Sequence, residues 1–341
     1  MTNSSISIEE HDNVKPIRYQ ILDNWICILV VLVISGHAMF PGHPAWYDAF
    51  HGWLYSFHMG AFFFVCGFLV CHTYRPISSI SEYIHYIEKR LFKFGLPYLV
   101  LGIILTIISL YEQHSKMENL PIWLWRLVIC PPQSKVIFLW FIYVLFGFYL
   151  IAPLLVQYCP PKLLIVIIIM GIFPALHWQL FPKAFCLNFF AKYLVFFLLG
   201  IFIRYYISAI PSISIHYTWC FFVAFLPASI LNTYIPYLVT CLLSLPCFYV
   251  FAWLMNKSMI LCTISYHISK NCFGIYLLQM FFLHVSHRFW NRFIPLSLNY
   301  YLLFLLITIP VTIIGSLCIT YLLNWIATYL KCQVKLLPKY H

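Results

Sequence analysis

Charged residues are scarce in this chain of 341 residues: Asp, Glu, Lys and Arg make up 9% of it, against 63% hydrophobic residues. Soluble domains cover their surface with about a quarter charged residues, so the composition excludes an ordinary soluble globular protein. Long apolar runs take the place of the missing charge. We therefore expect an all-α polytopic membrane protein, because a helix satisfies its own backbone hydrogen bonds in lipid.

Carboxylates are missing from most of the chain, since all nine Asp and Glu lie at or before Glu118. Chemistry that needs paired carboxylates is therefore restricted to the first third. The thirteen cysteines form no CxxC pair and no Cys/His cluster at ligand spacing, so we interpret them as small core residues and expect no metal site. The net charge of +11 is typical of basic loops that orient a membrane protein, and no nucleic-acid partner is expected.

Apolar segments long enough to span the hydrocarbon core, about 20 residues each, recur along the chain. They cover approximately residues 21–40, 52–72, 91–110, 136–157, 163–179, 188–207, 215–231, 234–254, 271–290 and 300–328. The expected fold is thus a bundle of about ten transmembrane helices. A polar tail at 1–20 precedes a single transmembrane domain at 21–330, and a short basic tail follows at 331–341.

The distribution of Lys and Arg predicts the orientation. With ten spans and a cytoplasmic amino terminus, thirteen of the twenty basic residues fall on the cytoplasmic side and six on the other, while Lys192 lies inside a span. Cytoplasmic loops are enriched in Lys and Arg, so we expect both termini in the cytoplasm and a multi-pass protein of the cell inner (plasma) membrane.

The longest connection, about 111–135, is expected on the outer side and holds Trp123, Trp125 and Arg126. Two interpretations are open for it. It is either an amphipathic piece on the membrane surface or a partial cover over an acceptor site.

Ionisable residues inside membrane helices are costly and mark functional sites. Histidine is the cheapest of them, since it is readily neutral and accepts a proton near neutral pH. His37 lies near the outer end of the first span, and His58 lies a similar distance inside the second. Antiparallel neighbours would bring the two rings to similar depth. The alternative is a pair of core histidines bonded to backbone or to each other.

Asp23, and the pair of Arg90 and Lys93, lie near the ends of spans, and each has a structural and a functional interpretation. Asp23 lies 14 residues before His37, about 21 Å along a helix, so the two cannot touch. Asp23 is expected to cap the first helix or pair with a basic group. Arg90 and Lys93 open the third span at the cytoplasmic side. They either anchor the helix, as basic residues commonly do there, or hold the phosphates of an anionic donor.

Five stretches follow one another in a fixed order. They are Leu22-Asp23 with Gly36-His37; residues 57–68, which read Phe-His-Met-Gly-Ala-Phe-Phe-Phe-Val-Cys-Gly-Phe; Arg90 and Lys93 ahead of Pro97; Leu139-Trp140-Phe141 with Pro153; and Phe273-Gly274-Ile275-Tyr276-Leu277. Together they resemble, over about residues 20–280, the acyltransferase type 3 membrane family, whose members O-acylate sugars of the cell envelope.

The resemblance implies a bundle of helices with an acyl-CoA donor on the cytoplasmic side and an acceptor on the far side. It implies that His37 is the catalytic histidine, assisted by His58. It also favours the phosphate-binding interpretation of Arg90 and Lys93. By the same resemblance Asp23, Trp140, Tyr276 and Gln279 are candidate substrate or pocket residues.

Two positions depart from the family pattern. The family usually has Arg or Lys three residues after the first-helix Asp, where this chain has Ile26. The family's Tyr-Leu-x-His segment ends here in Gln279, and His284 is five residues further on, about 140° around the helix. These departures are consistent with a divergent substrate or with loss of activity.

The implied function is that of a membrane-bound O-acyltransferase. It would move an acyl group, expected to be acetyl, from acyl-CoA to a hydroxyl of a cell-surface or lipid-linked carbohydrate. His37 would act as general base or would first be acylated itself. Acetyl-CoA would be a donor substrate rather than a bound cofactor, and membrane lipid the other partner. The alternatives are a transporter or flippase of a glycan or small solute, and an inactive relative that serves as a sensor or partner subunit.

Overall fold

The computed structural model describes residues 19–112, 117–206, 215–293 and 300–336. Every regular element in these ranges is helical, which confirms the expected all-α fold. The helices are α1 (Gln20–His37), α2 (Ala45–Tyr55), α3 (His58–His72), α4 (Ile80–Arg90), α5 (Leu96–Glu112), α6 (Leu120–Ile129), α7 (Trp140–Tyr158), α8 (Pro161–Leu176), α9 (Leu187–Tyr206), α10 (Ile215–Ile230), α11 (Tyr237–Met255), α12 (Met259–Lys270), α13 (Cys272–Phe293) and α14 (Tyr301–Leu336). Most of the predicted tails, at 1–18 and 337–341, lies outside the described residues.

Seven segments of the described chain are long and apolar enough to cross a membrane. They are Gln20–His37, Ala45–His72, Ile80–Tyr111, Ile137–Tyr158, Ala184–Tyr205, Tyr237–Met255 and Tyr301–Tyr329. Three shorter apolar helices cover Leu120–Ile129, Pro161–Leu176 and Cys220–Ile230. The protein is therefore a helical membrane protein, while a count of about ten spans and the side on which the termini lie stay predictions.

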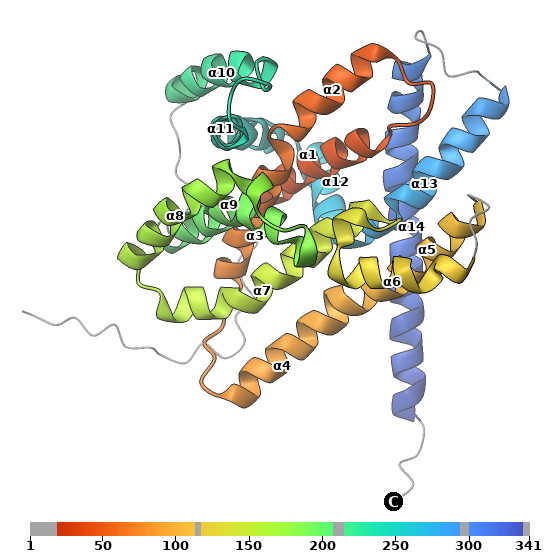
Figure 1. Cartoon of the computed structure of the whole chain (residues 1–341), viewed down its shortest axis with the longest axis horizontal. Helices are drawn as coiled ribbons and strands as arrows, with labels where there is room; N and C mark the ends of the chain where they lie inside the picture. The colour runs from red at the N-terminus through yellow and green to blue at the C-terminus, as the bar shows by residue number, and fades with distance from the viewer. Residues whose placement is uncertain (1–18, 113–116, 207–214, 294–299, 337–341) are drawn as a thin grey trace, which may run out of the picture.

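Helix α1 lies at the centre of the fold and packs against α3, α11, α12 and α13 (Figure 1). Its side chains are buried almost throughout, from Leu22 to Gly36. Ile26, at the position where the family has a basic residue, is 5% exposed and belongs to this core. A helix that is apolar on every side is expected inside a bundle rather than at its lipid surface.

Helices α3 and α9 approach each other closely because each has a glycine that faces the backbone of the other helix. A Cβ at Gly67 would come within 2.0 Å of the Phe197 carbonyl oxygen, and one at Gly200 within 2.0 Å of the Phe64 carbonyl oxygen. Small residues let backbones pack tightly where lipid offers no hydrophobic drive for association. This contact fixes the start of α3 relative to the start of α9.

The second predicted span, 52–72, is two helices. The chain leaves helical geometry at Phe57, where φ is −149°. In a continuous helix the Leu54 carbonyl would accept the backbone N–H of residue 58. Here it accepts Nδ1–H of the His58 side chain at 2.7 Å. A backbone donor in the first turn of α3 finds its partner on another helix, since Gly60 N–H donates to the Tyr237 hydroxyl of α11 at 2.8 Å.

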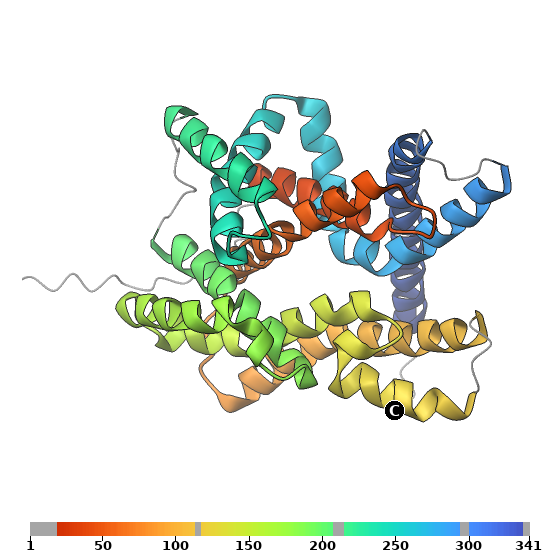
Figure 2. The same cartoon turned by 45° about the horizontal axis from the view of Figure 1, so that its top comes forward.

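Helix α4 reaches α5 through a π-helical turn at Leu91–Gly95 and crosses α7. Pro153 lies inside α7 and has no N–H, so the Tyr149 carbonyl loses its intrahelical partner. Tyr86 of α4 donates its hydroxyl to that carbonyl at 2.9 Å. Helices α4–α7, orange to yellow, lie below the red and cyan helices α1 and α12 in Figure 2.

Helix α12 covers a segment that the sequence suggested was a connection between spans. It packs along α1 and buries Ser265, Ile268 and Ser269. Ser265 donates to the Asn24 side chain, and Ser269 donates to Oδ1 of Asp23 at 2.6 Å. The polar start of α1 is thus held by serines of α12, which the hydropathy of residues 259–270 did not indicate.

Candidate active site

His37 is the last residue of α1, and its half-buried ring faces the interior. Gly36 lets α2 approach at this point, because a Cβ there would meet the Tyr55 ring at 2.9 Å. The Phe138 ring stands edge-on to the His37 imidazole, with centroids 6.3 Å apart. Nδ1 of His37 is buried and has no hydrogen-bond partner among the described residues. A basic nitrogen is therefore left available inside the bundle.

Gln279 lies beside this imidazole, within hydrogen-bonding reach. Its side chain is 1% exposed, and its Nε2 has no partner among the described residues. Tyr276, nearly one turn earlier on α13, donates its hydroxyl to the Phe138 carbonyl. Helix α13 therefore supports both the His37 ring and the Phe138 segment that packs against it.

His58 begins α3 and is 1% exposed. Because a carbonyl can only accept, the bond from Nδ1 to Leu54 places the proton on Nδ1 and leaves the Nε2 lone pair free. His58 is close enough to His37, His51 and Lys192 to interact with each electrostatically. The site therefore holds three imidazoles and one primary amine.

Trp140 begins α7 and is half-buried. Its ring lies 4.3 Å from the Phe189 ring and stacks on Tyr193 at 5.4 Å. The neighbouring Phe141 ring lies 5.3 Å from that of Tyr276. Aromatic rings of α7 and α9 thus run from Tyr276 toward the start of α9.

Lys192 is the basic residue inside a predicted span, and it lies at the end of that aromatic row. Its Nζ is 4.1 Å from the centroid of the Tyr237 ring and 4.4 Å from that of Trp178. The sequence placed Lys192 inside a span but assigned it no partner. The signal that pointed to it was the cost of a charge within a membrane helix.

Arg90 and Lys93 are neighbours at the end of α4 and in the π-helical turn. The Arg90 guanidinium lies over the Tyr149 ring at 4.7 Å and the Tyr86 ring at 5.0 Å. Lys93 is exposed and near Cys272, the first residue of α13. Neither cation has an ion pair with a carboxylate among the described residues, so both are available to an anionic ligand.

Helix α13 connects the two groups. Cys272 interacts electrostatically with Lys93, and the adjoining rings of Phe94 and Phe273 pack with their centroids 5.1 Å apart. Gln279 is near enough to His37 to interact with its ring. Seven residues of helix separate Cys272 from Gln279, which is about 10 Å along the axis. The cationic pair and the imidazole therefore lie at successive levels of one helix.

Asp23 lies apart from both groups. It is 4% exposed, in the first turn of α1, and accepts from Ser269. The length of α1 places it about 21 Å from His37. The predicted site residues thus fall into three places. One is the imidazole cluster of His37 and His58, with Gln279, Tyr276 and Trp140 on the neighbouring helices. The others are the Arg90–Lys93 pair and Asp23.

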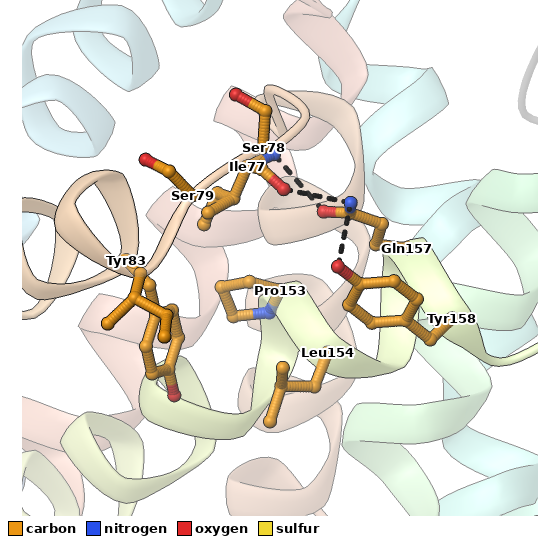
Figure 3. Close-up of a pocket in the computed structure, with 9 residues that line it drawn as sticks. Ile77, Ser78, Ser79, Tyr83, Pro153, Leu154, Gln157 and Tyr158 are labelled. Carbon is orange, nitrogen blue, oxygen red and sulfur yellow. Dashed lines mark hydrogen bonds between the residues drawn. The ribbon is translucent and has the colours of Figure 1, made fainter.

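A separate cavity of about 250 Å³ lies between the loop after α3 and the end of α7 (Figure 3). Gln157 ties the two together: its amide accepts from Ile77 N–H at 3.1 Å and donates to the Ile77 carbonyl at 2.9 Å. Ser78, Ser79 and Tyr83 line the cavity.

No group of three His, Cys, Asp or Glu side chains suited to a metal ion is found in the part of the chain that the structure describes.

A family model described as an acyltransferase domain matches residues 20–323. Searches of curated proteins and of solved structures gave no match. The matched range begins at the first residue of α1 and ends inside α14, so it includes every site residue described above.

Proposed function

Because the chain belongs to the acyltransferase type 3 membrane family, we propose that it transfers an acyl group, such as acetyl, from acyl-CoA to a hydroxyl of an envelope carbohydrate. The observation that carries this proposal is the His37 ring. It sits inside the bundle with a nitrogen that no described residue engages, next to a buried amide and a second histidine.

The chemistry needs a base, since a sugar hydroxyl is a poor nucleophile. An imidazole nitrogen of His37 takes the hydroxyl proton while the oxygen attacks the thioester carbonyl carbon. The carbon–sulfur bond then breaks, and the coenzyme A thiolate takes the proton back from the imidazolium. General-base help of this kind contributes about 10²–10⁴-fold in rate. Gln279 orients the ring, and His58 lies where it can share the positive charge.

The donor would be held by the Arg90–Lys93 pair, apart from the imidazoles. Arg90 and Lys93 supply two cations without carboxylate partners among the described residues, which suits the phosphates of an acyl-CoA. The acyl end of the donor would then extend along α13, past Tyr276, toward His37. In this proposal the donor phosphates and the base would both lie beside α13, at levels about 10 Å apart along its axis.

The direct test is made in a host whose envelope glycan is chemically defined. Acyl content of the glycan is measured by mass spectrometry with the wild-type chain, His37→Gln and His267→Gln at equal membrane levels. His267 is an exposed histidine of α12 bonded to the Tyr321 hydroxyl, so it serves as the matched control. We expect acylation with the wild type and the control only. Equal acylation by His37→Gln would overturn the role of His37.

One observation favours a second candidate, a relative that no longer binds its donor. Ile26 is buried in the apolar core where the family has a basic residue. Restoring the charge with Ile26→Arg distinguishes the two. If the donor site is degraded, acyl-CoA binding to the membranes rises in the variant. If Arg90 and Lys93 suffice, binding stays level or falls, because a buried unpaired charge disturbs the core.

A further inference from the structure

Lys192 is surrounded by aromatic rings on several elements. Trp178 precedes α9, Tyr193 lies on α9 and Tyr237 begins α11; their ring centroids are 4.4, 5.4 and 4.1 Å from the Lys192 amine. Phe189 extends the surface, with its ring stacked at 5.9 Å from that of Trp178. Three segments of the chain thus converge on one amine.

This amine has no carboxylate partner among the described residues. None is available nearby in sequence, since the last acidic side chain of the sequence is Glu118. The ring faces compensate only part of the cost of burying the charge. The rings offer no anionic hydrogen-bond acceptor to the amine, and a charged side chain within a membrane segment is a candidate ligand or ion site.

The aromatic cage, defined as Trp178, Phe189 and Tyr237 around Lys192, is partly accessible at the surface of the described chain. Trp178, Phe189, Lys192 and Tyr237 are half-buried rather than fully covered. Ring faces of this kind suit the C–H faces of a sugar, which pack on aromatic surfaces. The amine adds a single charged donor that fixes orientation, as polar groups do in largely apolar pockets.

The position relates the cage to the reacting centre. Lys192 interacts electrostatically with His58, and His58 with His37. The Tyr237 hydroxyl of the cage binds the backbone of Gly60, two residues after His58. The cage therefore contacts the imidazole cluster through α3, which begins at His58. The Arg90–Lys93 pair is connected to the imidazole cluster through α13.

We propose that Lys192 and the rings of Trp178, Phe189 and Tyr237 form an acceptor subsite that binds an anionic group of the carbohydrate, a carboxylate or a phosphate. The inference rests on the proposed acyltransferase function and adds that the acceptor is an acidic or phosphorylated glycan. The amine pairs with the anion while the rings hold the adjoining sugar, which leaves a hydroxyl of that sugar facing the imidazoles.

The test uses the full chain in proteoliposomes with three acceptor probes. They are a glucuronic-acid-terminated disaccharide, the matching glucose-terminated disaccharide, and that glucose disaccharide linked to a polyprenyl diphosphate. The variants are Lys192→Met, which removes the charge at similar length, and Lys192→Arg, which keeps it. Lys257→Met is the control, because Lys257 also lies over an indole, that of Trp253, at 4.0 Å.

We expect the wild type to prefer one anionic probe over the neutral one. Lys192→Met should raise the KM of that probe about ten- to a hundredfold, the loss expected for a hydrogen bond to a charged group. The KM of the neutral probe should change less than about twofold, and Lys192→Arg should retain most of the preference. The probe that responds identifies the source of the charge, a sugar carboxylate or a lipid-linked phosphate.

Binding of the same probes, followed by tryptophan fluorescence, separates this inference from the proposed function. A charge preference that Lys192→Met abolishes, with no acyl transfer to any probe, supports the subsite and contradicts the acyltransferase. Wild-type binding or transfer without charge preference, or equal loss of all three probes in Lys192→Met, overturns the subsite. If the Met variant does not fold, the wild type and Lys192→Arg carry the test: a folded Lys192→Arg variant that binds the probes without charge preference overturns the subsite.

Discussion

The imidazole of His37 differs from that of His58 in its hydrogen bonding. The Nδ1–H of His58 donates a hydrogen bond to the Leu54 carbonyl, as expected of a histidine with a structural role in the core. Nδ1 of His37 has no such bond among the described residues, and the nearby polar group is the Gln279 amide. The geometry therefore suits His37 to proton transfer and His58 to a supporting role.

Gln279 stands where the family has a histidine, and its contact with His37 gives it a testable role. Gln279→Leu keeps the approximate size but removes the amide. We predict about a tenfold fall in kcat, as expected if the amide donates a hydrogen bond of about 1–1.5 kcal/mol to the imidazole during the reaction, with little change in the KM for acyl-CoA. Steady-state kinetics in proteoliposomes measures both. A rise in that KM with kcat unchanged would place Gln279 in donor binding instead.

His43, in the turn between α1 and α2, provides a pH-dependent contact next to the site. The Phe40 carbonyl and the Asp48 carboxylate accept hydrogen bonds from its two ring nitrogens and raise its pKa above 6.5. Because the pKa of His43 is higher in the folded than in the unfolded protein, its charged ring stabilises the fold fully at a pH below the unfolded-state pKa. This stabilisation is lost as the pH rises through the folded-state pKa.

Asp48→Asn should therefore increase hydrogen exchange of residues 38–48 at about pH 6, below the ordinary histidine pKa. The difference from the wild type should shrink as the pH rises past the raised pKa of His43. Mass spectrometry of peptides from this turn follows the exchange. A difference that stays constant from pH 6 to pH 9 would show that His43 ionisation is not involved.

At the residue level the sequence was most informative about intramembrane polar groups. His37 and His58 stood out because histidine is rare and costly inside a span. The contact of Gln279 with His37 was not predictable, since it depends on how α13 packs on α1. The rings around Lys192 come from three segments between Trp178 and Tyr237, and no local pattern relates them.

Among the helices, the α3–α9 contact is the one most sensitive to a single methyl group. Gly67→Ala would place a Cβ 2.0 Å from the Phe197 carbonyl, so the helices must separate and His58 moves away from Lys192. We predict a lower melting temperature and loss of acyl transfer. Gly52→Ala is the control, because nothing lies within 4 Å of its Cβ and alanine favours a helix. Equal stability of the two variants would contradict the close approach of α3 and α9.

Helix boundaries show where hydropathy is insufficient. It predicted one helix over 52–72, but the chain breaks at Phe57 because the His58 side chain takes the Leu54 carbonyl. Hydropathy predicted no span over residues 259–270, which form α12 and bury Ser265 and Ser269 on one face. Those serines are buried because Asn24 and Asp23 of α1 bind them, a pairing between segments far apart in the sequence.

For the whole molecule, the distribution of basic residues predicts cytoplasmic termini. Reporters fused after His341 and after Pro41 test this orientation. A reporter that is active only in the cytoplasm should work at His341 and fail at Pro41, in the turn after the first span. Activity at Pro41, or failure at His341 with a stable fusion, would require a different number of crossings or the opposite orientation.

The arrangement of the whole bundle gives α1 and α13 the central part. Helix α1 ends at His37, while α13 passes from Lys93 to His37 through Cys272 and Gln279. The Arg90–Lys93 pair is joined to the imidazole cluster through α13, and the rings around Lys192 are joined to it through α3.

The measurement that tests the role of His37 most directly is the rate of acyl transfer by the purified chain in proteoliposomes, with labelled acetyl-CoA and a glycan acceptor. His37→Gln should lower kcat at least about a hundredfold, the lower limit of general-base catalysis, while His267→Gln stays within about twofold. A His37→Gln variant that is folded and transfers acetyl at the wild-type rate would contradict the assignment of His37 as the catalytic base.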